Sequence, residues 1–198
     1  MRILKMQEKY LEVFLESLDK FGTLYGPVER RGVLTYDKVE NLSEVELGGK
    51  HPMIPLKKLF HPKKFTMLHF NERGFYPDYS MIKRRVVLGV HPCEIHGLAK
   101  LDDIFLKEPV DPYYKGLRDS TAIIGFSCLP TENSICNATG TDIVKDGFDL
   151  FFVDLDEFYL VWVGSSLGHD MIYEREEFFE EDVKHEDIQK YVQWREKR

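Results

Sequence analysis

The sequence predicts an α/β fold of the α+β kind: a mixed sheet that contains a βαβ unit, with N-terminal and C-terminal helices. Two uninterrupted apolar segments, residues 84–90 (RRVVLGV) and 120–128 (STAIIGFSC), lack the alternation of a half-exposed strand. Such runs are typical of strands that are covered on both faces. A helical pattern lies between them, so strand, helix and strand predict two parallel strands joined by a right-handed crossover.

The first predicted element is a helix over residues 3–21. Apolar side chains recur there at three- and four-residue spacings, which would form one stripe along about five helical turns. They are Met6, Tyr10, Val13, Phe14, Leu18 and Phe21. The simplest interpretation is a helix that packs against the core.

Short apolar segments separated by turn residues follow, at residues 23–28, 32–39 and 66–70. They predict strands of a mixed or antiparallel sheet. Between the second and the third, prolines at positions 52, 55 and 62 confine any helix to residues 56–60.

Residues 84–90 are the best candidate for a central strand. Pro92 then suits the first turn of a helix, where its missing amide donor costs nothing. The apolar face of this helix consists of Leu98, Leu101, Ile104 and Phe105. Cys93 therefore falls at a helix N-terminus directly after a buried strand.

The last third of the chain predicts a hairpin and a charged end. The apolar segments 148–155 and 159–165 form the hairpin. We expect one domain over residues 1–172 and a charged helical extension over residues 173–198. The extension is either a solvated helix or a partner-docking helix, whose contacts would be Phe178, Phe179, Tyr191 and Trp194.

Composition excludes several classes of protein. The chain has 198 residues, 43% of them hydrophobic, which suffices for one compact core. The net charge of -7 argues against nucleic acid as a partner, because phosphate contacts need a basic face. No apolar run approaches the roughly 20 residues of a membrane span, and no export signal is legible, so we expect a cytoplasmic protein. Abundant Lys, Glu and Asp with few Asn and Gln are associated with thermophile proteins.

The three cysteines, Cys93, Cys128 and Cys136, are an odd number in a chain without an export signal, which argues against a disulfide framework. Because parallel strands end at the same edge of a sheet, Cys93 and Cys128 are expected at the edge where open α/β sheets place ligands. The helix N-terminus should favour the thiolate of Cys93, which suits metal ligation as much as nucleophilic attack.

Several chemistries remain open at these thiols. A zinc site made by the three cysteines with His91 or His96 lacks the usual C-x₂-C pairs. A cysteine hydrolase would need a nucleophile elbow or an oxyanion hole, and neither is legible. An iron–sulfur cluster accepts widely spaced cysteines if the fold gathers them. Each histidine can equally be a hydrogen-bonded surface residue.

Four motifs follow one another in a recognisable order: residues 89–106 (GVHPCEIHGLAKLDDIFL), 110–128 (VDPYYKGLRDSTAIIGFSC), 134–143 (SICNATGTDI) and 159–168 (YLVWVGSSLG). This order resembles the N-terminal region of the beta subunit of cytoplasmic sulfhydrogenases and the A subunit of anaerobic sulfite reductases. These are iron–sulfur electron-transfer proteins of anaerobes. The likeness covers nearly the whole chain.

The resemblance implies that Cys93, Cys128 and Cys136 bind one iron–sulfur cluster of the [4Fe-4S] type. Cys93 matches the cysteine of the family's G-V-R-P-C-D motif, and Cys136 matches the last cysteine of its C-F-C motif. Only three thiolates are present, so a non-cysteine fourth ligand, a [3Fe-4S] cluster or loss of the cluster are all open. The candidate fourth ligands are Ser134, which stands where the motif has a cysteine, Glu94, His91 and His96.

By the same resemblance, the chain is expected to be an electron-transfer or accessory subunit of a hydrogenase-like or other anaerobic redox complex. Family members continue into a ferredoxin-like domain with C-x₂-C-x₂-C-x₃-C runs, which this sequence lacks. The expected partners are therefore other redox subunits (ferredoxin-like, flavin or hydrogenase subunits), one of which performs the chemistry on a substrate. The alternatives are a clusterless partner- or ligand-binding module on the same fold and a structural zinc protein.

Overall fold

The computed structural model describes residues 2–47, 49–132 and 134–197. An eight-stranded mixed sheet forms its centre, in the order β10-β1-β9-β8-β7-β6-β2-β3. Its strands are β1 (Arg2–Gln7), β2 (Thr23–Arg30), β3 (Val33–Lys38), β6 (Arg85–Val90), β7 (Thr121–Phe126), β8 (Leu150–Asp154), β9 (Phe158–Val163) and β10 (Phe179–Glu180). The pairs β2–β6, β6–β7 and β7–β8 are parallel and the others are antiparallel.

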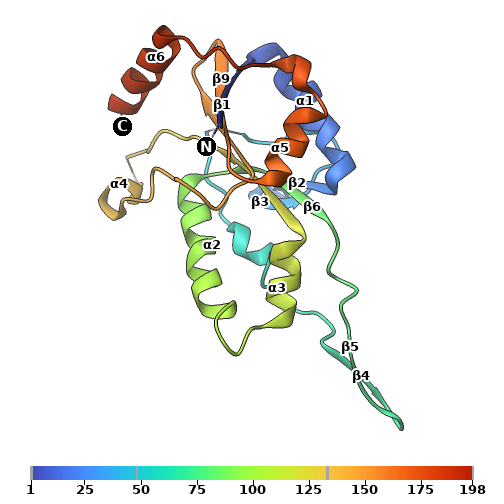
Figure 1. Cartoon of the computed structure of the whole chain (residues 1–198). Coiled ribbons are helices and arrows are strands. Elements are labelled where there is room, and N and C mark those ends of the chain that lie inside the picture. The colour runs from blue at the N-terminus through green and yellow to red at the C-terminus, as the bar shows by residue number, and fades with distance from the viewer. Residues whose placement is uncertain (1, 48, 133, 198) are drawn as a thin grey trace.

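Helices cover both faces of the sheet (Figure 1). The α-helices are α1 (Leu11–Ser17), α2 (Pro92–Phe105), α3 (Pro112–Asp119), α4 (Cys136–Thr139), α5 (Ser166–Tyr173) and α6 (His185–Glu196). The 3-10 turns are η1 (Glu8–Tyr10), η2 (Leu18–Phe21), η3 (Leu42–Glu44), η4 (Leu56–Leu59) and η5 (Glu176–Phe178). None of the helices in the described part of the chain is long and apolar enough to cross a membrane.

Successive residues of the central strands supply two hydrophobic cores. In β6, Val86 and Leu88 pack with α1 and α5, whereas Val87 packs with α2 and α3 on the other face. In β7, Ile124 packs in the same core as Val86, and Ile123 packs in the same core as Val87. Both faces are buried, which explains why these segments show no polar alternation. The predicted central strands are confirmed.

The predicted βαβ unit is also confirmed. β6 and β7 are adjacent parallel strands with Arg85 opposite Thr121, and α2 and α3 lie in the connection between them. α2 begins at Pro92, as its sequence predicts. The hairpin predicted over residues 148–165 forms as β8 and β9.

The helix predicted over residues 3–21 is wrong in its first turns. Residues 2–7 form strand β1, which pairs with β9 along its whole length, from Arg2 opposite Val163 to Gln7 opposite Phe158. Leu4 and Met6 both face the core, so this stretch follows the two-residue period of a strand. Two residues are too few to reveal a strand pattern in the sequence, because Met6 also continues the helical spacing of the residues that follow it. Helical structure begins only at η1 and continues through α1 and η2.

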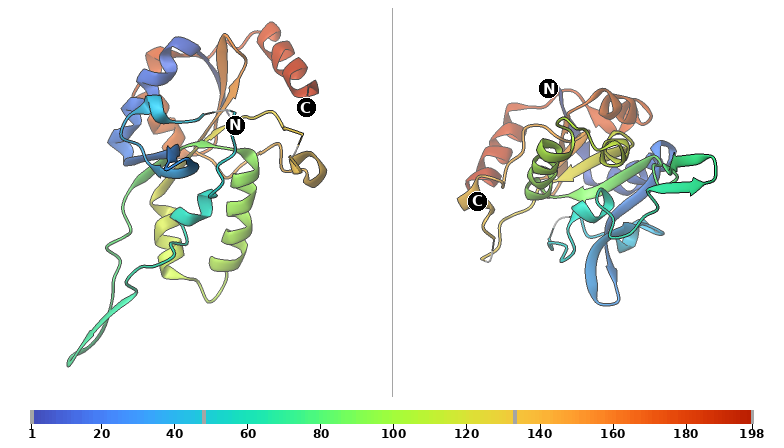
Figure 2. Two further views of the ribbon diagram at one scale, coloured as in Figure 1. Left: turned by 180° about the vertical axis from the view of Figure 1, so that it is seen from behind. Right: turned by 90° about the horizontal axis from the view of Figure 1, so that it is seen from below.

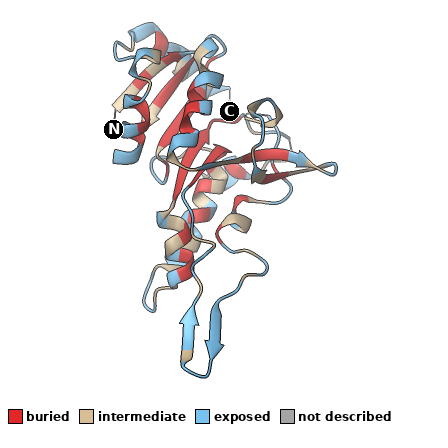
Figure 3. Cartoon of the chain, turned by 90° about the vertical axis from the view of Figure 1, so that its right-hand side faces the viewer, coloured by how far each residue is buried: buried red, intermediate tan, exposed pale blue. Residues whose placement is uncertain are grey.

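The strand predicted at residues 66–70 lies outside the main sheet. It becomes β4 (Leu68–Asn71), which pairs only with β5 (Gly74–Pro77) in a separate two-stranded hairpin. The hairpin extends away from the body of the molecule and is mostly exposed (Figures 2 and 3). Phe70, for example, is 81% exposed. Four-residue strands without a covering layer bury too little apolar surface to join the core.

The charged segment after Tyr173 is not one continuous helix. It forms η5, the short strand β10 beside β1, and then α6. Phe178 and Phe179 pack against the first core, which draws the chain back to the sheet before α6 begins. The ammonium group of Lys5 donates to the carboxylate of Asp187 at 2.8 Å and so ties β1 to α6. The division into residues 1–172 and 173–198 stays a prediction.

Candidate metal centre

The carboxyl ends of β6 and β7 place two of the predicted ligands at one edge of the sheet. Gly89, near the end of β6, has a φ of +67° at a shift in the strand register. A Cβ atom there would lie 2.9 Å from the ring of Pro27, so the position requires glycine. The chain leaves β6 at His91, the N-cap of α2, and Cys93 follows in the first helical turn. Cys128 follows the end of β7 by two residues.

Cys93 is half-buried, and its thiol is harder to ionise than the helix terminus alone would predict. Burial raises the pKa of Cys93 to about 11, and the charges of Glu94 and Cys136 add to the effect. Backbone hydrogen bonds at the helix N-terminus do lower the pKa of Cys93, as expected, but burial outweighs them in the metal-free chain. A neutral thiol is a poor nucleophile, which disfavours the cysteine hydrolase. A bound metal would supply the positive charge that the thiolate needs.

Cys128 and Cys136 are both buried, in the segment after β7 and at the start of α4. The charge of Cys136 acts on Cys93. The charges of Cys93 and Cys128 both act on the hydroxyl of Tyr36, whose pKa burial raises well above its usual value. The three thiols are therefore linked by electrostatic interactions, either directly or through Tyr36, at this edge of the sheet. No pattern in the sequence marks Tyr36 as a site residue. It is buried in β3, and its hydroxyl donates to the carbonyl of Gly89 at 3.2 Å.

Two histidines approach Cys128. One donor atom from each of His51, His91 and Cys128 lies within 4.8 Å of the others. Among the described residues, His51, His91 and Cys128 form the one group of three histidine, cysteine or carboxylate donors that is close enough to hold a single ion. The three thiols do not form such a group. Ligands of a cluster bind different iron atoms, so they need not converge on one point.

His91 has an unusual environment. It is 1% exposed, and its Nε2 atom has no hydrogen-bond partner in the structure. Its Nδ1 atom lies 3.0 Å from Nδ1 of His51, so one of the two nitrogens donates to the other. Burial, with a smaller contribution from His51, lowers the pKa of His91 to about 4. The metal-free imidazole is therefore neutral at pH 7.

The other predicted fourth ligands already have hydrogen-bond partners. Ser134 Oγ accepts from the amide of Thr131 at 2.9 Å. The carboxylate of Glu94 accepts from a backbone amide of η4, and His96 Nε2 lies 2.8 Å from the carbonyl oxygen of Ile143. Of the four candidates, His91 keeps a buried nitrogen without a partner.

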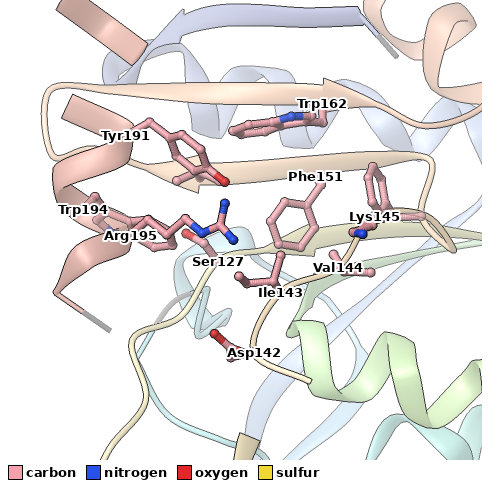
Figure 4. A pocket seen from close by; sticks show the side chains of 12 residues that line it. Ser127, Asp142, Ile143, Val144, Lys145, Phe151, Trp162, Tyr191, Trp194 and Arg195 are labelled. Carbon is pink, nitrogen blue, oxygen red and sulfur yellow. The ribbon is translucent and has the colours of Figure 1, made fainter. Parts of the chain in front are cut away.

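An aromatic cavity of about 360 Å³ lies beside this edge, between α6, β8–β9 and the loop after α4 (Figure 4). Trp162, Tyr191 and Trp194 line it, together with Lys145 and Arg195. The rings of Trp162 and Tyr191 lie 5.3 Å apart. Its lining includes Ser127, the neighbour of Cys128, so the cavity adjoins the metal centre. No cysteine or histidine of the described chain is part of the lining.

Strand-end thiols and histidines at the edge of a mixed sheet define a candidate metal-binding α/β protein. Comparison with known proteins narrows the class. The chain is 34% identical over all of its 198 residues to Sulfhydrogenase 2 subunit beta of Pyrococcus furiosus, and it spans 59% of that protein's length. The resemblance found in the motifs is thereby confirmed, and it is consistent with the N-terminal region of a hydrogenase beta-like subunit. The heat-adapted composition is consistent with a relative from this organism.

No family model matches the chain. No solved structure matches it either.

Proposed function

We propose that this chain is an electron-transfer or accessory subunit of a hydrogenase-like or other anaerobic redox complex, and that it binds one iron–sulfur cluster through Cys93, Cys128 and Cys136. The observation that carries the proposal is the 34% identity to a sulfhydrogenase beta subunit along the whole chain. The location of two of these cysteines at adjacent strand ends supports it.

The residues present fit such a cluster. Thiolates are its usual ligands, and three cysteines from separate segments can hold it where the fold gathers them. His91 offers a fourth donor, because one of its ring nitrogens lies near Cys128 and its buried Nε2 has no hydrogen-bond partner. When bound, the cluster would supply one-electron transfer.

The chain's own residues would set the properties of that electron carrier. Burial of Cys128 and Cys136 limits access of water and oxygen. The low-dielectric surroundings and the hydrogen bonds to the ligands tune the reduction potential. With three cysteines in the sequence, a second cluster of the usual kind has no ligands here. The proposed role includes redox partner subunits. It also includes a cytoplasmic location.

Anaerobic purification with iron and acid-labile sulfide analysis tests this function. We expect a brown protein with iron and sulfide in equal amounts, and each of Cys93→Ser, Cys128→Ser and Cys136→Ser should lower both contents sharply. Ser134→Ala is the matched control, because its side chain is already bonded to Thr131. The control should keep its iron. Equal iron contents in all four variants would refute the ligand assignment.

A clusterless binding module is the second candidate function. The aromatic cavity with its two cationic side chains favours it, since concave sites with a few polar groups are typical of ligand binding. Ser134→Cys separates the two functions, because it restores the missing thiol of the C-F-C motif. Under the cluster proposal it raises iron occupancy after anaerobic reconstitution. Under the second it does not.

A further inference from the structure

We propose that His51, His91 and Cys128 form a binding site for one divalent transition-metal ion, with Zn²⁺ as the ion that this donor set suits best. The site shares Cys128 and the fourth donor, His91, with the proposed cluster, but the inference does not depend on the cluster being present. Two imidazole nitrogens and one sulfur are ligands that zinc accepts in a tetrahedral arrangement, with its fourth position open to water.

The spacing of the donors carries the inference. Zinc binds nitrogen at about 2.0–2.1 Å and cysteine sulfur at about 2.3 Å, so neighbouring ligand atoms around one ion lie roughly 3.3–3.6 Å apart. The three donors here lie within 4.8 Å of one another in the absence of any ion. The donors therefore need to approach one another by at most about 1.2–1.5 Å to bind one ion.

The buried nitrogen of His91 is the second, independent observation. A polar atom without a partner inside a protein costs free energy, and most such atoms have one. His91 Nε2 is buried without a hydrogen bond, while Nδ1 is held against His51. A metal ion bound through Nε2 would give this nitrogen a partner, and one bound through Nδ1 would replace the contact with His51. The pair of facing imidazoles then becomes part of a coordination sphere.

Backbone hydrogen bonds hold the segment that carries each ligand. The loop that carries His51 runs along β3, where the amide of Met53 donates to the carbonyl of Leu34 at 3.0 Å. His91 caps α2, and its carbonyl accepts from the amide of Glu94 at 3.0 Å. Cys128 follows Ser127, whose amide donates to β8 at 2.8 Å. His51 is exposed, so an ion can enter from its side.

The ion and the cluster exclude each other, because both need Cys128. Cys93 and Cys136 belong to the cluster ligands alone, and His51 belongs to the ion site alone. This difference in ligands makes the two sites experimentally separable. It also means that Zn²⁺ should slow iron uptake during anaerobic reconstitution.

Cobalt titration of the metal-free, full-length chain tests the inference. Co²⁺ replaces Zn²⁺ and reports a thiolate ligand through a charge-transfer band in the near ultraviolet. We expect saturation at one Co²⁺ per chain and displacement by Zn²⁺. His51→Ala, His91→Ala and Cys128→Ser should each weaken binding by more than about 100-fold, since loss of an outer-sphere partner alone costs about 10–100-fold.

Cys93→Ser, Cys136→Ser and His96→Ala are the matched controls and should bind Co²⁺ as the parent chain does. His51 is exposed, so His51→Ala keeps the fold, which circular dichroism verifies. Absence of the charge-transfer band, or binding that depends on Cys93 and Cys136 but not on His51, would overturn the inference. A chain that binds Co²⁺ but takes up no iron contradicts only the proposed function. A chain that assembles a cluster but binds no Co²⁺ contradicts only the ion site.

Discussion

The carboxylate of Glu94 accepts a hydrogen bond of 3.0 Å from the backbone amide of Leu56. This contact joins the first turn of α2, which carries Cys93, to the turn η4 across 38 residues of sequence. Burial raises the pKa of Glu94, and its negative charge in turn raises the pKa of Cys93. Glu94 therefore holds the helical turn that carries Cys93, and its charge adds to burial, which is the main cause of the raised pKa of the thiol.

Replacing Glu94 with an uncharged isostere should make Cys93 more reactive. In Glu94→Gln the neighbouring charge is gone, so the pKa of Cys93 falls and more thiolate is present at pH 9. The rate of iodoacetamide alkylation at Cys93, followed by peptide mass spectrometry in the metal-free protein, should rise. Glu94→Asp keeps the charge and serves as the control. An unchanged rate in Glu94→Gln would show that burial alone holds the thiol neutral.

Two glycine-to-alanine changes should shift stability in opposite directions. Gly89 has a left-handed backbone, and an added methyl group would meet Pro27, so Gly89→Ala should destabilise the fold by at least about 1–2 kcal/mol. Gly97 lies inside α2 with open space around it, so Gly97→Ala should stabilise by about 0.4–1 kcal/mol. Urea denaturation measures both. Equal effects at the two positions would contradict the conformation given for Gly89.

The core around β8 should be far more sensitive than the projecting hairpin. Phe152 is 0% exposed and stacks on Phe126 with ring centroids 4.9 Å apart. Phe152→Ala should therefore cost about 3–5 kcal/mol. Phe70→Ala, on the exposed hairpin, should change stability by less than about 0.5 kcal/mol. A large loss for Phe70→Ala in urea denaturation would show that the hairpin is packed against something.

The ion pair between Lys5 and Asp187 should make part of the stability depend on pH. Burial opposes ionisation of Asp187, but the hydrogen bonds from Lys5 and Lys184 outweigh it and lower the pKa of the carboxyl. Because the pKa of Asp187 is lower in the folded state, its carboxylate stabilises the fold at pH values above the unfolded-state pKa of about 3.9. This stabilisation is lost as the pH falls through the folded-state pKa. Asp187→Asn should thus lower the urea midpoint at pH 7, and the difference from the parent chain should shrink as the pH falls below about 4. A constant difference across that range would contradict the ion pair.

The central part of the fold could be predicted from the sequence because burial on both faces leaves a plain signal. Residues 84–90 and 120–128 are apolar without alternation, and Pro92 marks the start of α2. Strand β1 could not be predicted, since Met6 continues the helical spacing of Tyr10 and Val13, whereas the two-residue spacing of Leu4 and Met6 covers a single period of a strand. What decides between them is pairing with β9, more than 150 residues away in sequence. A local pattern carries no information about such a partner.

Some residues of the candidate site could likewise be predicted from the sequence, and others could not. Cys93 and Cys128 could be placed at one edge because parallel strands end together. His51 could not, because it lies in a proline-rich loop that shows no metal-ligand spacing to His91 or Cys128. Only the pairing of that loop with β3 brings it to the site, through the bridge between Thr35 and Ile54. That burial outweighs the helix N-terminus at Cys93 could not be predicted, because the burial of this thiol is not visible in the sequence.

The central claim is that Cys128 and its neighbouring thiols hold an iron–sulfur cluster, and the most direct test is the iron and acid-labile sulfide content of protein purified without exposure to air. The account predicts iron and sulfide in equal amounts in the parent chain and their loss in Cys128→Ser. Colourless parent protein, free of both iron and sulfide after anaerobic preparation, would contradict it.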